Sequence, residues 1–445
     1  MLSSRLSHCL KARPSAFVSQ VGLRLKQACP AYRQGIFASQ LSRGANFQRR
    51  GYSEDARKQP NSDHDVQGRL ERDEKKESVL RATDVQRKLN DVYYHPTTGF
   101  ISHLPRSWVP YAELARLDKP TGTLYLLYPC LFSTFMAASM TSPIVMPQQV
   151  VLTSALFLAG AFVMRGAGCT VNDLWDRNLD PHVERTKFRP LARGAVTPFR
   201  AITFLGAQLL VGLGILLQFP TSCLYYGIPS LLLVGTYPLA KRVTNYPQFV
   251  LGLTFSWGAI MGFPAMGIDF LSDTNALYAA AALYASCVAW TVNYDMIYAH
   301  MDIKDDVKAG IKSIALAHQH NTKKVLRGLT VVQVALLAAS GAFAGLTGVS
   351  FWVGSVVSSA FMLSRITRKV NLESVRSCLY WFKAGAWMVG NVIAGGLFVS
   401  YIAKYHKHEK IEFVKGGPAL EGFRWPAEVA TSKTDTEASE HRSDG

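Results

Sequence analysis

Four polar residues at the end of one long apolar run have a spacing that could place oxygen ligands on one face of a helix. Asn172, Asp176 and Asp180 stand at positions i, i+4 and i+8. Asp173 precedes the same two aspartates by three and seven positions. Residues with these spacings share a helix face. The segment therefore predicts converging carboxylate and amide oxygens wherever the helix continues through it.

A second cluster at the end of another apolar run repeats this pattern. Asp295, Tyr298, Asp302 and Asp306 stand at positions i, i+3, i+7 and i+11. The chain thus contains a weak internal repeat, because an acidic segment followed by another helix occurs at the end of two of its helices.

Carboxylates brought together in this way need a cation. Without one they would repel each other and lose hydration at the edge of an apolar bundle. Mg²⁺ prefers oxygen ligands and is commonly held by carboxylates together with the phosphates of a substrate. Basic residues that could bind such phosphates follow the clusters, at Arg185, Lys187, Arg189, Lys241, Arg242 and Lys312. The pattern favours a Mg²⁺-dependent site for an amphiphile with a diphosphate head and a hydrocarbon tail.

A plainer interpretation has to be weighed against this one. Charged loops between membrane helices usually determine topology, and a single Asn-Asp-x-x-Asp segment would carry little weight. Two clusters with helical spacing, each followed by basic residues, favour a functional role. His300 lies among the aspartates, and we expect it to be a loop residue because hard cations prefer oxygen. The seven cysteines are scattered without paired spacing, which argues against a disulfide framework or a zinc site.

The elements that position these clusters are apolar runs of membrane-spanning length. The chain has 445 residues, of which 49% are hydrophobic and 18% charged, and the polar residues gather at its two ends. A helix needs about 20 apolar residues to cross a bilayer. We predict nine spans, at residues 121–140, 147–169, 201–219, 221–240, 247–267, 276–297, 328–345, 350–364 and 378–403. The expected fold is an all-α polytopic membrane protein with about nine transmembrane helices in a bundle around a central cavity, which excludes a soluble globular protein.

The loops between these spans alternate in charge. Those after the second, fourth, sixth and eighth spans carry Lys and Arg, whereas those after the first, third, fifth and seventh contain neither. The positive-inside rule places the basic loops on the side from which insertion occurs. Both acidic clusters lie on that side, because four spans separate them. One feature does not fit: an odd number of spans places the C-terminal tail on the side opposite to the basic loops, yet the tail begins with Lys404, Lys407 and Lys410. Long polar tails follow the positive-inside rule only weakly.

The N-terminal region predicts the compartment. Lys and Arg exceed Asp and Glu by 48 to 31, a net charge of +17, and residues 1–53 contain no acidic residue. An Arg-rich, Ser-rich leader without acids is typical of a mitochondrial transit peptide, which we place at residues 1–52. A basic arm that binds nucleic acid is the alternative, and we disfavour it because residues 54–100 turn acidic and show no nucleic-acid fold. We expect the inner membrane, with the acidic clusters facing the matrix, and no nucleic-acid partner.

The same segments resemble a known family. Residues 116–124, 164–180, 184–194, 237–242, 251–258 and 294–313 are similar to stretches of the UbiA superfamily of intramembrane aromatic prenyltransferases, and most closely to members that act in mitochondrial ubiquinone biosynthesis. The resemblance covers about residues 106–400. It implies a transmembrane prenyltransferase domain at residues 106–404, preceded by a disordered polar linker at 53–105 and followed by a polar tail at 405–445.

The resemblance also implies a reaction. An all-trans polyprenyl group would pass from polyprenyl diphosphate to the ring carbon ortho to the hydroxyl of 4-hydroxybenzoate, with release of diphosphate. Two sets of residues would serve the diphosphate. The metal ligands would be Asn172, Asp176, Asp180, Asp302 and Asp306, with Asp173 as a further ligand or as a partner of the ligands. Phosphate oxygens would be bound by Arg185, Arg189, Lys241, Arg242 and Lys312.

The acceptor would need its own residues. The resemblance implies that Asp295 takes or orients the phenolic proton, beside the catalytic metal ligands Asp176 and Asp302. Arg165 lies within the second span, where it could bind the carboxylate of the acceptor or pair with a nearby aspartate, and both readings stay open.

Other polar residues near or within the spans are harder to assign. Tyr237 and Tyr298 could line the acceptor site, although tyrosines near a membrane interface often serve as anchors. Asn391 and Lys383 are polar residues within the last span for which the sequence suggests no role.

Other functions also fit parts of this pattern. A mitochondrial inner-membrane transporter would have polar groups near the bilayer midplane, whereas the acidic clusters here lie at the ends of spans. A UbiA-type enzyme with a different acceptor, or an inactive scaffold for quinone synthesis, would share the fold. Besides the two substrates and the lipid bilayer, other quinone-synthesis enzymes are candidate partners.

Overall fold

The computed structural model of the protein describes residues 93–183, 185–303, 307 and 312–414. The predicted transit peptide, residues 53–92 of the predicted linker, Asp306 and residues 415–445 of the predicted tail lie outside the described residues. Within the described residues every regular element is a helix and there is no strand, which confirms the all-α fold.

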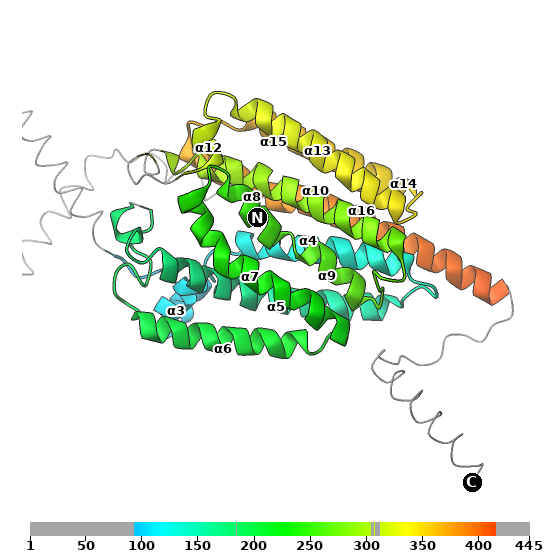
Figure 1. Ribbon diagram of the computed structural model, residues 1–445, viewed down its shortest axis with the longest axis horizontal. Coiled ribbons are helices and arrows are strands. Elements are labelled where there is room, and N and C mark those ends of the chain that lie inside the picture. Colours follow the sequence, from blue (N-terminus) through cyan, green and yellow to red (C-terminus); the bar gives the residue numbers. More distant parts are fainter. Residues whose placement is uncertain (1–92, 184, 304–306, 308–311, 415–445) are drawn as a thin grey trace, which may run out of the picture. The chain divides into compact units, whose positions relative to one another are not determined.

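The helices follow one another with short connections. Their bounds are η1 Phe100–His103, α3 Val109–Leu114, α4 Thr121–Met140, α5 Pro147–Trp175, η2 Asp180–His182, α6 Pro198–Leu216, α7 Thr221–Val243, α8 Pro247–Phe255, α9 Gly258–Ala265, α10 Thr274–Ala299, α12 Ile314–Ala317, α13 Thr322–Phe343, α14 Val349–Phe351, η3 Trp352–Val357, α15 Ser358–Lys369 and α16 Val375–Val414. The helices that form the bundle run roughly parallel or antiparallel to one another (Figure 1).

Among the described residues, seven helices are long and apolar enough to cross a membrane. They are α4, α5, α6, α10 and α13, the helical stretch Val349–Lys369 and the part of α16 up to Lys410. The fourth predicted span forms α7, which is not one of the seven, and the fifth is divided between α8 and α9. The membrane-protein fold is therefore confirmed, while the predicted count of nine is not.

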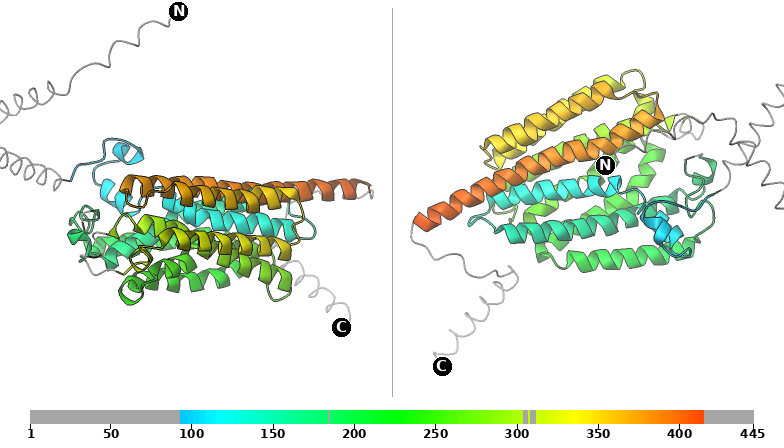
Figure 2. Two further views of the ribbon diagram at one scale, coloured as in Figure 1. Left: turned by 90° about the horizontal axis from the view of Figure 1, so that it is seen from above. Right: turned by 180° about the vertical axis from the view of Figure 1, so that it is seen from behind.

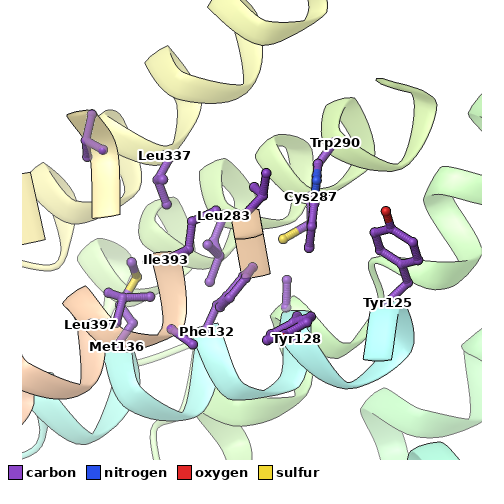
Figure 3. Packing of buried hydrophobic residues seen from close by; sticks show 14 of the residues in the cluster. Tyr125, Tyr128, Phe132, Met136, Leu283, Cys287, Trp290, Leu337, Ile393 and Leu397 are labelled. Carbon is purple, nitrogen blue, oxygen red and sulfur yellow. The ribbon is translucent and has the colours of Figure 1, made fainter. Parts of the chain in front are cut away.

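The core lies between α4, α10 and α16. Figure 3 shows side chains from these three helices packed against each other, including Tyr128 and Phe132 of α4, Trp290 of α10 and Ile393 of α16. The α6 helix differs, because almost none of its apolar surface is buried inside the bundle. Exposed apolar side chains on such a helix suit contact with lipid.

After the break in the fifth predicted span, two glycines allow α9 to pack closely against α4. Gly258 and Gly262 stand four residues apart on α9, and the Ser133 hydroxyl of α4 donates to the Gly258 carbonyl at 2.7 Å and accepts from the Gly262 amide at 3.0 Å. A Cβ atom at Gly258 would lie 3.0 Å from the backbone nitrogen of Cys130. Small residues at this spacing allow close packing of membrane helices.

A polar contact inside the bundle gives Asn391 a structural role. The Tyr128 hydroxyl donates a hydrogen bond of 2.7 Å to Asn391 Oδ1, which joins α4 to α16. A Cβ atom at Gly390 would meet the Tyr128 ring, so the glycine admits the tyrosine that Asn391 binds. Lys383 is exposed.

The last helix is the longest. α16 continues past the predicted end of the final span at residue 403 and stops at Val414. Figure 2 shows it along the bundle, with its C-terminal turns extending beyond the other helices. Near this end the Tyr401 hydroxyl donates to the Val145 carbonyl at 2.6 Å, and Lys404 Nζ donates to the Ser139 carbonyl at 2.6 Å.

Candidate active site

The first acidic segment lies where α5 ends. The helix stops at Trp175, but the chain remains tightly turned, since the Asp176 amide donates to the Asn172 carbonyl at 2.9 Å and the Asp180 amide donates to the Asp176 carbonyl at 2.8 Å. Asp176 and Asp180 therefore lie in a compact turn beyond the helix, rather than on one face of a continuous helix. Asn172, Asp173, Asp176 and Asp180 are all buried.

Asp173 is the most deeply buried of these residues and is held by two arginines. Arg116 Nη2 donates to both Asp173 oxygens, at 2.8 and 2.9 Å. Arg189 Nη1 lies 3.2 Å from Asp173 Oδ1. The Asp173 side chain has no exposed surface. Its charge is therefore balanced inside the protein.

Arg189 also binds Asp180. Its Nη1 atom lies 3.0 and 2.9 Å from the two Asp180 oxygens. Burial raises the pKa of Asp180, and the positive charge of Arg189 offsets only part of this effect. Burial alone would lower the pKa of Arg189, but Asp173 and Asp180 outweigh it and hold the guanidinium charged.

Arg185 connects the two acidic segments. Its Nε and Nη2 atoms donate to the two oxygens of Asp302, both at 2.8 Å, and its Nη1 atom donates to the Tyr298 hydroxyl at 2.9 Å. Asp302 lies just after the end of α10, 117 residues beyond Arg185. Burial lowers the pKa of Arg185, whereas Tyr298 and Asp302 raise it more. The predicted meeting of the two segments is therefore present in the structure.

Two further predicted residues join this region to neighbouring helices. The Tyr237 hydroxyl of α7 donates a 2.9 Å hydrogen bond to Asn172 Oδ1. Lys312 is exposed, with its Nζ atom 3.5 Å from the Val243 carbonyl. The side chains of Lys241 and Arg242 lie outside the described part of the structure.

Arg165 and Asp295 lie within the helices that lead to the two segments. Arg165 is on α5, with its guanidinium 5.5 Å from the centre of the Phe255 ring. Asp295 is on α10, close enough to Tyr125 and Tyr294 to interact electrostatically with both. His300, at the end of α10, bonds to the Met296 carbonyl and to Thr322, which fits the loop role expected for it.

Several residues of this region were not predicted. Arg116 lies before α4, 57 residues from its partner Asp173, and takes a positive φ of 58°. Arg193 and Glu113 form an ion pair of 2.6 Å, and the Tyr93 hydroxyl donates to Glu113 at 2.6 Å. The only signal for Arg116 was its place in the 116–124 stretch. Arg193 lay likewise within the 184–194 stretch, whereas Glu113 of α3 showed no signal, because its partner comes 80 residues later in the sequence.

The donor set suits a hard divalent cation by its chemistry. Asn172, Asp176, Asp180 and Asp302 offer amide and carboxylate oxygens, the ligand types that Mg²⁺ prefers. In the part of the chain that the structure describes, no three Asp, Glu, His or Cys side chains are grouped closely enough to hold one ion. The guanidinium groups of Arg185 and Arg189 bind the oxygens of Asp302 and Asp180 instead.

One family of known proteins matches most of the helical bundle, including both acidic segments. Residues 126–391 match the UbiA prenyltransferase family. The chain belongs to this family. The UbiA match includes the acidic segments of both α5 and α10, and it agrees with the resemblance expected from the sequence.

Curated UbiA relatives share a high level of identity. A protein of Saccharomyces cerevisiae named "4-hydroxybenzoate polyprenyltransferase, mitochondrial" is 44% identical over 302 residues, which cover 68% of this chain and 77% of the yeast protein. A protein of the same name from Schizosaccharomyces pombe is 44% identical over 67% of this chain and 82% of its own length.

Solved UbiA structures support the helical architecture. A UbiA homologue from Aeropyrum pernix superposes with a TM-score of 0.52 and 23% identity, covering 62% of this chain and 97% of its own. A homologue from Archaeoglobus fulgidus, solved with GPP and Mg²⁺, gives a TM-score of 0.50 at 16% identity, covering 67% of this chain and 99% of its own. At these identities the likeness concerns the fold.

Proposed function

We propose that this UbiA protein transfers an all-trans polyprenyl group from polyprenyl diphosphate to the ring carbon ortho to the hydroxyl of 4-hydroxybenzoate. The names of the relatives in Saccharomyces cerevisiae and Schizosaccharomyces pombe support this reaction over transport. The observation that carries the proposal is the double hydrogen bond from Arg185 to Asp302, because it brings the two acidic segments to one end of the bundle.

The acidic segments would hold Mg²⁺ against the diphosphate. The residues proposed to do so are Asn172, Asp176, Asp180, Asp302 and Asp306. When bound, Mg²⁺ would neutralise charge on the diphosphate and make it a better leaving group. Asp173, with both oxygens bound by Arg116, would hold Arg116 and Arg189 in position rather than the cation.

The basic residues would bind the leaving group directly. Arg185 and Arg189 present planar guanidinium groups, which match phosphate oxygens in pairs. Lys241 and Arg242, in the last turn of α7, and Lys312, after α10, would add positive charge nearby. Donors fixed in advance around the diphosphate stabilise the charge that develops as the allylic carbon–oxygen bond breaks.

The acceptor would be activated on α10. Asp295 would take or orient the phenolic proton of 4-hydroxybenzoate, which makes the ring more nucleophilic, while Tyr237 and Tyr298 line its path. The diphosphate leaves with the electron pair of the carbon–oxygen bond, and the ring carbon ortho to the hydroxyl forms the new carbon–carbon bond. The proton on that carbon then passes to the released diphosphate, while the phenolic oxygen keeps its proton or regains it from Asp295. An apolar bundle would keep water from capturing the allylic cation.

The reaction would take place at the matrix face of the mitochondrial inner membrane. Relatives named mitochondrial support the organelle, and the basic loops beside the acidic segments support the face. The predicted transit peptide at residues 1–52 would direct import, and the other enzymes of quinone synthesis would be neighbours in that membrane.

A membrane assay tests the proposal. Membranes containing the protein, Mg²⁺, polyprenyl diphosphate and 4-hydroxybenzoate should give the C-prenylated acid, identified by its mass spectrum. EDTA should abolish the product and added Mg²⁺ should restore it. The exposed Glu373 provides a control, since Glu373→Gln should leave the rate unchanged. Product formation that survives complete chelation would contradict the role of the cation, and prenylation of other phenols but not of 4-hydroxybenzoate would favour a different acceptor.

A further inference from the structure

Three residues that the proposed reaction does not use meet beside the loop that carries Arg185 and Arg189. Arg193 Nη2 donates to Glu113 Oε2 at 2.6 Å, and the Tyr93 hydroxyl donates to Glu113 Oε1 at 2.6 Å. The guanidinium of Arg193 also stacks on the Tyr93 ring, with Cζ 3.7 Å from the ring centre. We call Tyr93, Glu113 and Arg193 the brace. It joins the residues before η1 to α3 and to the connection between α5 and α6.

The brace is shielded from solvent, so its charges depend on one another. The side chains of Glu113 and Arg193 are only 14% and 13% exposed. Burial and the hydrogen bond to Glu113 raise the pKa of Tyr93 to about 12, which keeps its hydroxyl protonated and able to donate. Because a charge left unpaired in such surroundings is costly, loss of either charged partner should release the other from its place.

Arg193 also closes the backbone turn that contains Arg189. Its Nη1 atom donates to the Phe188 carbonyl at 2.6 Å, and its amide donates to the Arg189 carbonyl at 2.9 Å. The next residue, Gly194, takes a positive φ of 76°, which reverses the chain at the end of the turn. The turn of residues 188–193 is therefore tied end to end by Arg193, with Arg189 inside it.

Apolar packing fixes the same turn against α3. Leu114, the residue after Glu113, is fully buried and packs with Leu191, Val196 and Ala201. Figure 1 shows α3 beside the connection between α5 and α6, which agrees with this packing. Glu113 and Leu114 thus hold the connection by a charged contact and an apolar contact from one short helix.

The turn determines where Arg189 can place its guanidinium. Arg189 Nη1 lies 2.9 Å from Asp180 Oδ2 and 3.2 Å from Asp173 Oδ1. The hydrogen bonds of the brace go elsewhere, to its own members and to the Phe188 carbonyl. Donors that are fixed before a ligand arrives bind it more tightly, because less conformational freedom is lost on binding. The brace can therefore set the affinity of the site for phosphate without touching the phosphate.

We propose that Glu113 and Arg193 are positioning residues for the diphosphate, which act by holding the turn that presents Arg189, and that Tyr93 holds Glu113 in place. This inference rests on the proposed function and extends its diphosphate site to residues that precede α4. Because the proposed acceptor site lies at Asp295 of α10, the brace should affect binding of the diphosphate and not of the acceptor.

Equilibrium binding of inorganic pyrophosphate tests the positioning role without any reaction. With saturating Mg²⁺ and purified protein, Arg193→Gln should raise Kd for pyrophosphate about tenfold over wild type, because Arg189 must then be ordered on binding. Arg193→Lys should raise Kd only about threefold, because it keeps the charge opposite Glu113. The exposed Arg327 gives the matched control Arg327→Gln, which should bind as wild type does. An unchanged Kd in Arg193→Gln would overturn the inference.

Steady-state kinetics separate positioning from loss of folded protein. Arg193→Gln and Glu113→Gln should each raise KM for polyprenyl diphosphate about tenfold and leave KM for 4-hydroxybenzoate within about twofold. The double variant should show the same rise of about tenfold, because both substitutions break one contact. A fall in kcat with both KM values unchanged, or a rise of about 100-fold in the double variant, would contradict the proposal.

Tyr93→Phe provides a milder test that keeps the ion pair in place. It removes only the hydroxyl that donates to Glu113, and it should raise Kd for pyrophosphate about threefold. Tyr94 is exposed, so Tyr94→Phe should bind as wild type does. An unchanged Kd in Tyr93→Phe would refute the role of Tyr93. If wild type instead bound no pyrophosphate in the presence of Mg²⁺, the proposed diphosphate site itself would be refuted, so the two failures are distinguishable.

Discussion

The same chemical change in two aspartates of the site should have opposite effects. Asp173→Asn removes a charge whose side chain is fully buried, between arginines that are only 12% and 17% exposed. Breaking a buried ion pair from one side costs about 3–5 kcal/mol. We expect a loss of about 3 kcal/mol for Asp173→Asn, because asparagine can still accept one of the hydrogen bonds. The Tm in detergent should fall by roughly 6 °C.

Asp302→Asn should affect stability much less. Its partner Arg185 is 42% exposed and Asp302 is 15% exposed, so solvent screens the pair. Pairs of this kind contribute about 0–1 kcal/mol. Its effect should fall on catalysis instead, with a loss of about 10²–10³ in kcat, the size found when one stabilising group is removed from a charged transition state.

Thermal unfolding and product formation, measured on the same purified samples, separate the two effects. Activity per folded molecule in Asp173→Asn should remain within about tenfold of wild type, and Glu373→Gln should match wild type in both measurements. If Asp173→Asn kept the wild-type Tm and lost activity as Asp302→Asn does, Asp173 would be a ligand of the cation, and the assignment of its charge to Arg116 and Arg189 would be wrong.

Three further predictions concern groups around the site. Lys312→Met should raise KM for polyprenyl diphosphate more than KM for 4-hydroxybenzoate, in steady-state assays with each substrate varied; equal changes would remove its phosphate role. Glu113→Gln should lower the unfolding free energy by about 2 kcal/mol, because it leaves Arg193 without its charged partner, and limited proteolysis should then cut more rapidly between α5 and α6; an unchanged digestion pattern would argue against this. Gly262→Ala should lower Tm and the yield of membrane-inserted protein, since its Cβ atom would overlap the backbone of α4, whereas Gly206→Ala should behave as wild type.

The architecture and the meeting of the acidic segments could be predicted from the sequence. Each cluster follows an apolar run of membrane length, and an even number of such runs separates Asp176 from Asp302, which fixes both at one end. The helix that the spacing argument assumed ends at Trp175, although the turn after it keeps the hydrogen bonds from Asp176 to Asn172 and from Asp180 to Asp176.

The break between α8 and α9 could not be predicted in the same way. Hydropathy is continuous across residues 247–267, and it reports how apolar a segment is but not whether its backbone bends. The available signal was the pair Gly258 and Gly262, yet their meaning depends on Ser133, which lies more than 120 residues earlier.

Pairing between distant charges was equally hidden. Apart from its place in the 116–124 stretch, nothing in the local sequence distinguishes Arg116, which binds Asp173, from other arginines near the spans. The two readings of Arg165 were also left open, and they depended on whether a carboxylate reaches it. Such questions are decided by the packing of helices, which brings together residues whose separation in sequence carries no information about their separation in space.

Arg185 and Arg189 already have negative partners before any substrate arrives. When Arg185 and Arg189 turn to a phosphate group, Asp302 and Asp180 are left needing positive charge of their own. Anion and divalent cation should therefore enter cooperatively, each increasing the affinity for the other by the same factor. With the proposed phosphate and cation ligands, the protein should bind pyrophosphate alone or a divalent cation alone more weakly than it binds the two together.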